Sequence, residues 1–188
     1  FETTTHSLDV RRRIGYLPEN VPLYPEMRVL EFLAFRGRIK GLRGARLSTR
    51  LREVVEQCGL GDSSRRVIGT LSRGFRQRTG LADCLLPEPD VLLLDEPLAG
   101  LDPAQVQVVR DLLRGLGAGR SVLFSTHVLA EAEQLCHRVL ILNAGRLAAA
   151  DSPAKLVQAG ADGSFEDMFL RLTTLPPKVR NPKRRNGG

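Results

Sequence analysis

The sequence lacks any apolar run that approaches the roughly 18 to 20 consecutive residues needed to cross a bilayer. Its first residues, 1 to 6, do not resemble a signal peptide. It has only three cysteines, Cys58, Cys84 and Cys136, which are widely spaced among apolar residues. Such cysteines are typical of buried thiols in a reducing compartment and do not form a metal-binding pattern. We therefore expect a cytosolic chain, or one bound to a membrane only through a partner.

The remaining composition is ordinary for a globular protein of 188 residues, with 42% hydrophobic and 26% charged residues, and we find no internal repeat. The net charge is +7, but residues 173–188 contain no acid and hold +5 of it. This segment is also rich in proline, so we predict a disordered basic tail. Contact with anionic lipid or nucleic acid and simple solvation both remain open for it. Its basic residues are Lys178, Arg180, Lys183, Arg184 and Arg185.

The most informative segment is 91–103, where four aliphatic residues end abruptly in Asp95 and Glu96, followed by a proline. A short apolar run of this kind predicts a strand buried on both faces of a parallel sheet. Ligands in open α/β sheets bind just beyond the carboxyl ends of strands. Two adjacent acids there predict a metal and proton-transfer site. The alternative, an acid that caps a helix, accounts for one carboxylate but not for both.

A second buried strand is predicted at residues 121–125, and it leads directly into His127. The carboxyl ends of parallel strands share one edge of the sheet, so His127 is expected beside the acid pair. We predict that it contacts a phosphate, although a lone histidine is more often structural. His137 is interpreted as structural, and His6 carries no functional signal.

The chain between residues 26 and 88 shows helical periodicity without an intervening strand, which predicts a helical insertion into the α/β core. Ser72 is placed to cap the last of these helices, and Gly74 follows it. A helix amino end with small residues lets a phosphate approach closely, although a serine that only caps the helix is the simpler interpretation of this segment alone. For the helix at 26–40, the predicted apolar stripe comprises Leu30, Phe32, Leu33, Phe35 and Ile39.

Other elements follow from turn and cap signals. Residues 11–18 resemble a strand edge that runs into a turn, and Pro103 is expected at the first position of a helix that extends to residue 116. Residues 139–150 predict a hairpin, and residues 164–173 predict a closing amphipathic helix.

Four segments in this order resemble the nucleotide-binding subunit of an ATP-binding cassette (ABC) transporter. Residues 71–78 look like its signature motif, 91–96 like its Walker B strand, 99–102 like its D-loop and 125–127 like its switch histidine. The resemblance covers about residues 8–173, and residues 14–25 are similar to the ABC-2 type exporters. It implies an α/β P-loop NTPase (RecA-like) fold with a parallel-sheet core and a helical subdomain. The implied domains are an ATPase-core remnant with a Q-loop equivalent (1–25), the helical subdomain (26–88), the ATPase core (89–173) and a tail (174–188).

The resemblance also implies roles for the residues at the sheet edge. Asp95 would hold Mg²⁺ through water, Glu96 would polarise the water that attacks the γ-phosphate, and His127 would contact that phosphate. This division suits phosphoryl transfer, which needs charge neutralised and a nucleophile aligned.

Further roles extend to a second subunit and to the membrane partner. Ser72 and Gly74 would reach the γ-phosphate of ATP held by the other member of a homodimer, and Asp102 would couple the two sites. Glu19 stands where the family usually has a glutamine that senses Mg²⁺ and contacts the membrane domain. A carboxylate can still bind Mg²⁺, so Glu19 is kept as a metal and cofactor contact.

The sequence departs from the family pattern at three other points. Arg73 and Phe75 replace a glycine and a glutamine of the signature, and Leu98 replaces a common threonine. The form Gly-x-x-x-x-Gly-Lys-[Ser/Thr], which cradles the β- and γ-phosphates, occurs nowhere in the chain. In the family that loop precedes the segment at which this sequence starts. We therefore expect that the amino-terminal part of the ATPase domain is absent and that this chain alone binds ATP weakly or not at all.

The resemblance implies an ATP-hydrolysing subunit that powers export through a separate integral membrane permease. Such a subunit would be cytoplasmic and peripheral on the inner face of the cell membrane. One alternative is a soluble ABC-type protein that acts on ribosomes or nucleic acid, although its usual second cassette or long coiled-coil insertion is missing and no specific nucleic acid is expected. Another is a catalytically inactive fragment with a structural role.

Overall fold

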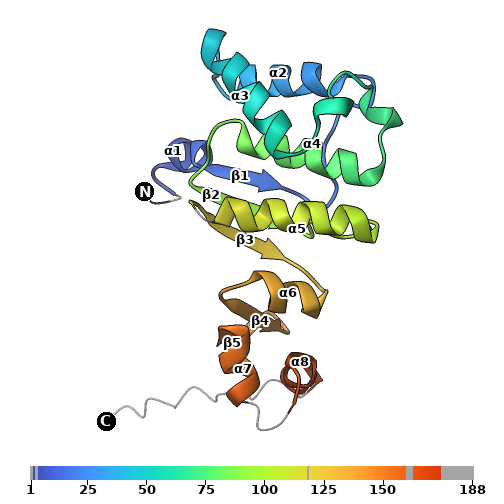
Figure 1. Cartoon of the computed structure of the whole chain (residues 1–188). Coiled ribbons are helices and arrows are strands. Elements are labelled where there is room, and N and C mark those ends of the chain that lie inside the picture. Colours follow the sequence, from blue (N-terminus) through green and yellow to red (C-terminus); the bar gives the residue numbers. More distant parts are fainter. Residues whose placement is uncertain (1, 3, 118, 160–162, 175–188) are drawn as a thin grey trace. The chain divides into compact units, whose positions relative to one another are not determined.

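The computed structural model describes residues 2, 4–117, 119–159 and 163–174. It divides into two compact units, Phe1–His127 and Val128–Gly188 (Figure 1). None of the helices in the described ranges is long and apolar enough to cross a membrane.

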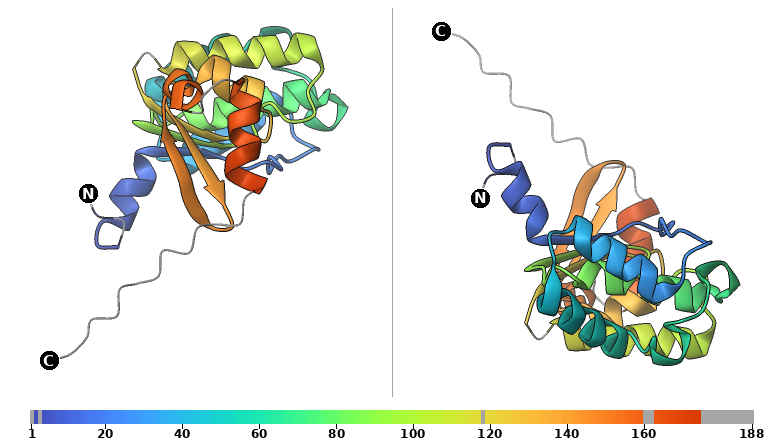
Figure 2. Two further views of the ribbon diagram at one scale, coloured as in Figure 1. Left: turned by 90° about the horizontal axis from the view of Figure 1, so that it is seen from below. Right: turned by 90° about the horizontal axis from the view of Figure 1, so that it is seen from above.

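The first unit is built on a parallel sheet in the order β1-β2-β3. The strands are β1 (Ile14–Leu17), β2 (Val91–Asp95) and β3 (Ser121–Ser125). The central strand β2 is the predicted acidic strand, and its last residue, Asp95, pairs with Ser125 of β3. A short helix, α1 (Ser7–Arg12), precedes β1; it contains no buried residue and projects away from the sheet (Figure 2). The prediction of a strand edge at residues 11 and 12 was therefore wrong.

The sheet is buried on one face only, which corrects the prediction of strands buried on both. Leu17, Leu92 and Leu94 lie on the buried face, whereas Tyr16 and Leu123 on the other face are 59% and 57% exposed. The strands advance in one direction across the sheet, and right-handed crossovers then place their helices on one and the same face. The crossover helices α4 (Arg73–Leu85) and α5 (Pro103–Gly117) contact β1 and β3, respectively.

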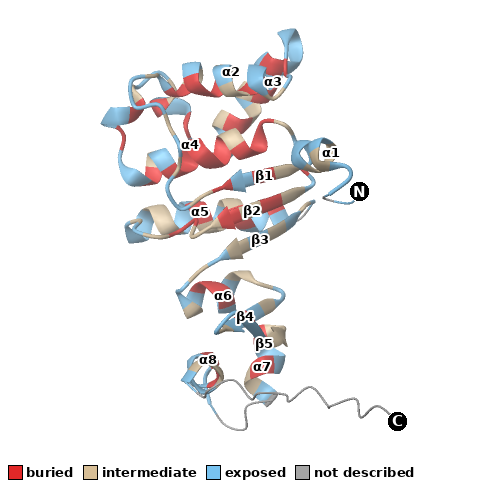
Figure 3. Ribbon diagram, turned by 180° about the vertical axis from the view of Figure 1, so that it is seen from behind, coloured by how far each residue is buried: buried red, intermediate tan, exposed pale blue. Residues whose placement is uncertain are grey.

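Between β1 and β2 lie the helices α2 (Val29–Ile39), α3 (Gly44–Gln57) and α4, with two short 3₁₀ turns, η1 (Gly61–Ser63) and η2 (Ile68–Thr70). Buried residues run along α4, which is the packing centre of this region (Figure 3). In α2 the buried stripe includes Phe32 and Leu33, but Phe35 is partly exposed and Ile39 is 61% exposed. Periodicity located the stripe, but it placed these two residues in the core incorrectly. The domain boundaries proposed above stay a prediction.

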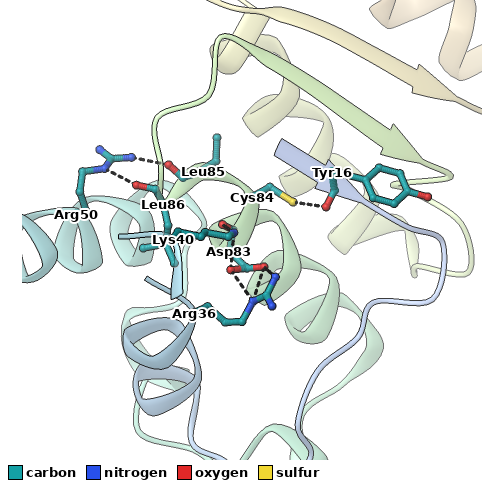
Figure 4. Close-up of polar contacts among 8 residues, drawn as sticks. All are labelled: Tyr16, Arg36, Lys40, Arg50, Asp83, Cys84, Leu85 and Leu86. Atoms are coloured by element: carbon teal, nitrogen blue, oxygen red, sulfur yellow. Dashed lines mark hydrogen bonds and ion pairs between the residues drawn. The ribbon is translucent and has the colours of Figure 1, made fainter. Parts of the chain in front are cut away.

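Ionic and polar contacts tie α2, α3 and β1 to the carboxyl end of α4 (Figure 4). The Asp83 carboxylate accepts hydrogen bonds from Arg36 Nη2 at 3.0 Å and from Lys40 Nζ at 2.7 Å. Arg50 donates to the carbonyl oxygens of Leu85 and Leu86, which end the helix. These contacts join α2 and α3 to α4. The residue after Asp83, Cys84, bonds to β1, so the same end of α4 also connects the helical region to the sheet.

That residue, Cys84, donates from Sγ to the carbonyl oxygen of Tyr16 at 3.1 Å. Cys58 and Cys84 are buried, and burial raises the pKa of both thiols to about 12. The prediction of buried thiols holds for these two, whereas Cys136 is only half-buried.

The second unit is a hairpin packed with three helices. It contains α6 (Leu129–Leu135), β4 (Val139–Asn143), β5 (Arg146–Asp151), α7 (Pro153–Ala159) and α8 (Phe165–Thr174). The predicted turn at Ala144 and Gly145 has φ values of 49° and 72°, as a tight hairpin turn requires, and Figure 2 shows the hairpin as a long ribbon. Apart from Thr173 and Thr174, which end α8, the predicted basic tail lies outside the described residues. The core of the unit consists of Ala132, Ile141, Leu156, Phe165 and Met168.

Candidate functional site

The carboxyl ends of β2 and β3 bring the predicted acid pair and the predicted histidine together. Asp95 is the last residue of β2 and lies opposite Ser125, the last residue of β3. Ser125 Oγ donates to Asp95 Oδ1 at 2.5 Å and accepts from the backbone N–H of Glu96 at 3.1 Å. One hydroxyl therefore fixes both the Asp95 side chain and the start of the loop that carries Glu96.

Glu96 and His127 are in direct contact. The distance from Glu96 Oε1 to His127 Nδ1 is 2.9 Å, and the Glu96 side chain is 19% exposed while the His127 ring is 74% exposed. The carboxylate is therefore partly shielded, and the imidazole faces outward, where a ligand can reach it. This arrangement gives a carboxylate suited to accept a proton and a ring nitrogen suited to a phosphate oxygen.

The backbone of Glu96 adds a feature that the sequence does not reveal. Its φ is 46°, in the left-handed region that residues with a side chain rarely adopt. Such a conformation costs on the order of 1 kcal/mol or more and is concentrated at functional sites. Here it turns the chain sharply at the end of β2, so that Asp95 and Glu96 can both lie at the rim.

The loop after Glu96 leads into α5, as the Asp102-Pro103 pair predicted. Asp102 Oδ1 accepts from the backbone N–H of Gln105 at 3.0 Å and so caps the helix. Gly100 has a φ of 67°, and Leu98 is buried. The side chain at the position of the usual threonine therefore serves packing in this chain.

Ser72 and Gly74 lie at the amino end of α4. Ser72 occupies the N-cap position, but its hydroxyl makes no cap hydrogen bond and the residue is exposed. The Ser72 hydroxyl therefore leaves the N–H groups of the first turn without a serine cap, as a phosphate contact would need. Gly74 is buried against α5.

Glu19 is exposed in the segment that follows β1. Because β1 ends beside Leu94 of β2, this segment leaves the sheet at the same edge as the acid pair. A cavity of about 500 Å³ lies beside this segment, and Arg36, Lys40 and Asp83 form part of its wall. Most of the rest of the lining comes from β1, from α2 and α4, and from Pro18, Val21, Pro22 and Leu23.

The carboxyl edge of the sheet, with Asp95 at the end of β2, is suited to an Mg²⁺ ion that is bound by protein and substrate together. It is less suited to a metal that is held by protein side chains alone. No cluster of three histidine, cysteine or acidic side chains occurs in the described parts of the chain. Mg²⁺ commonly binds one or two carboxylates and keeps several waters and phosphate oxygens. Asp95 fits this role, because Ser125 is bonded to its Oδ1 and its second oxygen can take a further contact. Nothing in the positions of these residues contradicts the predicted roles, which remain predictions.

Sequence reasoning missed three contributors. Ser125 was placed in the histidine motif without a role, although its register opposite Asp95 was the available signal. Arg78 and Gln105, which connect α4 to α5, gave no recognisable signal because they are 27 residues apart.

Comparison with known proteins matches residues 2–99 to the ABC transporter family. The chain is 44% identical over 137 residues to the uncharacterized ABC transporter ATP-binding protein YxlF of Bacillus subtilis, covering 73% of this chain and 46% of that protein. It is 35% identical over 150 residues to the Nod factor export ATP-binding protein I of Cupriavidus metallidurans, covering 79% of this chain and 50% of the relative. It is 39% identical over 163 residues to the daunorubicin resistance ATP-binding protein DrrA3 of Streptomyces coeruleorubidus, covering 86% of this chain and 51% of the relative.

A solved structure described as the ATP binding subunit of an ABC transporter superposes with a TM-score of 0.78 at 26% identity, covering 92% of this chain and 73% of that one. The mixed α/β fold with its parallel sheet is thus the predicted P-loop NTPase fold. The chain spans about half the length of the curated relatives it matches. The matched family model and these relatives show that the chain belongs to the ATP-binding subunits of the ABC transporter family.

Proposed function

We propose that the intact protein is an ATPase subunit that powers export through a separate membrane permease, and that this chain supplies its hydrolytic acid pair and its signature helix. The observation that carries the proposal is the contact between Glu96 and His127 at the rim where Asp95 also ends its strand. Export is favoured because two relatives are named for Nod factor export and for daunorubicin resistance. Hydrolysis is proposed for the intact protein, since this sequence contains no phosphate-binding loop of the form given above.

In this proposal Glu96 accepts a proton from the attacking water while His127 contacts the γ-phosphate. Their 2.9 Å contact would fix the position of the carboxylate relative to the imidazole. Asp95, held by Ser125, and Glu19 would hold the Mg²⁺, which supplies neutralising charge to the phosphate oxygens when bound.

Ser72 and Gly74 would act on ATP held by a second copy of the subunit. The exposed Ser72, whose hydroxyl makes no cap hydrogen bond, supports this role, whereas Gly74 lies buried behind it against α5. Asp102, at the start of α5, would lie beside them and couple the two sites of the homodimer.

The permease would bind at the cavity beside Glu19. Its wall combines apolar residues of β1 and α2 with the ionic cluster around Asp83, and Tyr24 and Ile39 lie exposed on adjoining segments. A partner that buries this region would cover apolar surface that water contacts in the separate chain.

The test is Glu96→Gln in the intact protein. This variant keeps the shape of the side chain but removes the proton acceptor, so we expect ATP turnover to fall by about a thousandfold while ATP binding persists and the ATP-bound dimer accumulates. Glu56→Gln, on an exposed position of α3, is the matched control and should keep the wild-type rate. Unchanged hydrolysis in Glu96→Gln would remove Glu96 from the role of base.

A further inference from the structure

A buried arginine connects the signature helix to the helix that follows the acid pair. Arg78 lies one turn after Gly74 on α4 and is 5% exposed. Its Nη2 donates to Gln105 Oε1 on α5 at 3.1 Å, and its Nη1 donates to the carbonyl oxygens of Cys58 and Gly59 at 3.2 and 2.8 Å. Arg78 therefore joins α4 to α5 and to the end of α3.

Burial of this guanidinium is unfavourable in itself. Burial lowers the pKa of Arg78 from its ordinary value, and its Nε has no hydrogen-bond partner among the described residues. Arginine nonetheless stays charged in proteins. The side chain is stabilised by its carbonyl and carboxamide partners and by the Phe75 ring, whose centroid lies 4.2 Å from the guanidinium carbon.

Gln105 is the second half of the connection. The backbone N–H of Gln105 donates to Asp102 Oδ1 at 3.0 Å. This bond couples the position of Gln105 to that of Asp102, the last residue of the loop before α5. Its carboxamide lies against Gly74, where an added Cβ would be 2.6 Å from Oε1 and 2.7 Å from Cγ. Gly74 thus has no side chain because Gln105 fills that space.

A separate contact reinforces the same junction. A Cβ on Gly100 would lie 2.6 Å from the guanidinium carbon of Arg73, the first residue of α4. Gly100 also has a positive φ of 67°, which only glycine adopts readily. The tip of α4 is therefore packed at two points, by Gln105 of α5 and by Gly100 of the loop that precedes α5.

We propose that Arg78 and Gln105 are positioning residues that hold the tip of α4 and the residue 97–102 loop as one rigid surface. This inference rests on the proposed function, in which Ser72, Gly74 and Asp102 all meet a second subunit. Ser72 and Gly74 lie at the amino end of α4, whereas Asp102 lies in the loop before α5. They can contact one partner subunit together only if α4 and this loop keep a fixed position relative to each other. Neither Arg78 nor Gln105 would touch the nucleotide.

The experiment replaces the acceptor without changing the size of the side chain. In the intact protein, Gln105→Met removes the bond to Arg78, whereas Gln105→Glu keeps an acceptor. We expect Gln105→Met to lower kcat about tenfold and to weaken ATP-driven dimerisation in the Glu96→Gln background, which corresponds to the loss of one charge-assisted hydrogen bond. ATP affinity of the separate subunit should change less than about twofold, and Gln105→Glu should restore kcat.

Gln107→Met is the matched control, because Gln107 lies two residues further along α5, is exposed and bonds only within its helix, to Asp111. Hydrogen exchange gives a readout that needs no ATPase activity. In Gln105→Met, amides 76–79 of α4 and 105–107 of α5 should exchange about tenfold faster, with amides 32–36 of α2 unchanged.

The outcomes separate the two proposals. If no form of the protein hydrolyses ATP, the proposed function fails. The hydrogen-exchange pattern alone then decides whether Arg78 and Gln105 are positioning residues. Unchanged hydrogen exchange in α4 and α5 of Gln105→Met would overturn the positioning role of Arg78 and Gln105. So would a wild-type kcat, a failure of Gln105→Glu to restore it, or a loss of kcat matched by an equal loss of ATP affinity and thermal stability.

Discussion

Neutralising Asp83 should destabilise the first unit, although this residue takes no part in the acid pair or its contact with His127. Asp83→Asn keeps the shape of the side chain but removes the charge that faces two cations. Arg36 Nη2 and Lys40 Nζ lie 3.0 and 2.7 Å from its oxygens, and its side chain is 13% exposed. The hydrogen bond to Asp83 raises the pKa of Arg36, so the guanidinium stays charged and this stabilisation does not change with pH across the neutral range.

The magnitude follows from burial. Breaking a fully buried ion pair by removing one partner costs roughly 3 to 5 kcal/mol, whereas an exposed pair is worth about 0 to 1 kcal/mol. The Arg36 and Lys40 side chains are 32% and 22% exposed, so solvent relieves part of the cost. We expect a loss of about 2 to 3 kcal/mol in the free energy of unfolding.

Urea unfolding followed by tyrosine fluorescence is the suitable assay. The chain has no tryptophan, and its two tyrosines, Tyr16 and Tyr24, both lie in the first unit. Asp90→Asn is the matched control, because Asp90 pairs with Arg13 at 2.8 Å but both side chains are more than half exposed. That variant should lose less than about 1 kcal/mol. Equal losses in the two variants would refute the assignment of the Asp83 cluster as the link between α2 and α4.

Three further predictions concern the rim and the buried thiols. Ser125→Ala should lower kcat about tenfold, because Asp95 and the Glu96 N–H lose a shared partner, while Ser121→Ala at the other end of β3 should not. His127→Ala should lower turnover about a hundredfold, and a normal rate would return the ring to a structural role. Folded Cys58 and Cys84 have pKa values raised to about 12 from 9.0, so the thiols ionise first in the unfolded chain. Stability should fall by about 2 kcal/mol between pH 9 and pH 10, and Cys58→Ala should remove about half of that fall in urea titrations.

Local signals predicted the elements that build the rim. The aliphatic run that ends at Asp95, the proline at the start of α5 and the short strand before His127 each specify structure within a few residues. Parallel strands then bring their carboxyl ends to one edge, so the contact between Glu96 and His127 follows from topology. The positive φ of Glu96 could not be predicted, because no residue type other than glycine marks that conformation.

Contacts between distant segments were not predictable in the same way. Asp83 meets Arg36 and Lys40 across 47 and 43 residues, and nothing in the spacing of these charges distinguishes them from a solvated surface. Arg78 is likewise buried through partners 19 to 27 residues away, which its position in the sequence does not indicate. Helical periodicity identified the stripe of α2 but not its limits, since Ile39, the last residue of the helix, is 61% exposed.

The structure also explains why the signature segment tolerates some departures and not others. Arg73 occupies the first turn of α4, where its side chain extends over Gly100 without displacing any other residue. Phe75 replaces a glutamine but stacks on Arg78, so its ring supports a buried cation. At Gly74 a side chain would displace the Gln105 carboxamide from its place against α4. A side chain at the position proposed to face the partner's phosphate would therefore disturb Gln105 within its own subunit, and a loss of activity in a Gly74 variant would not by itself show phosphate contact.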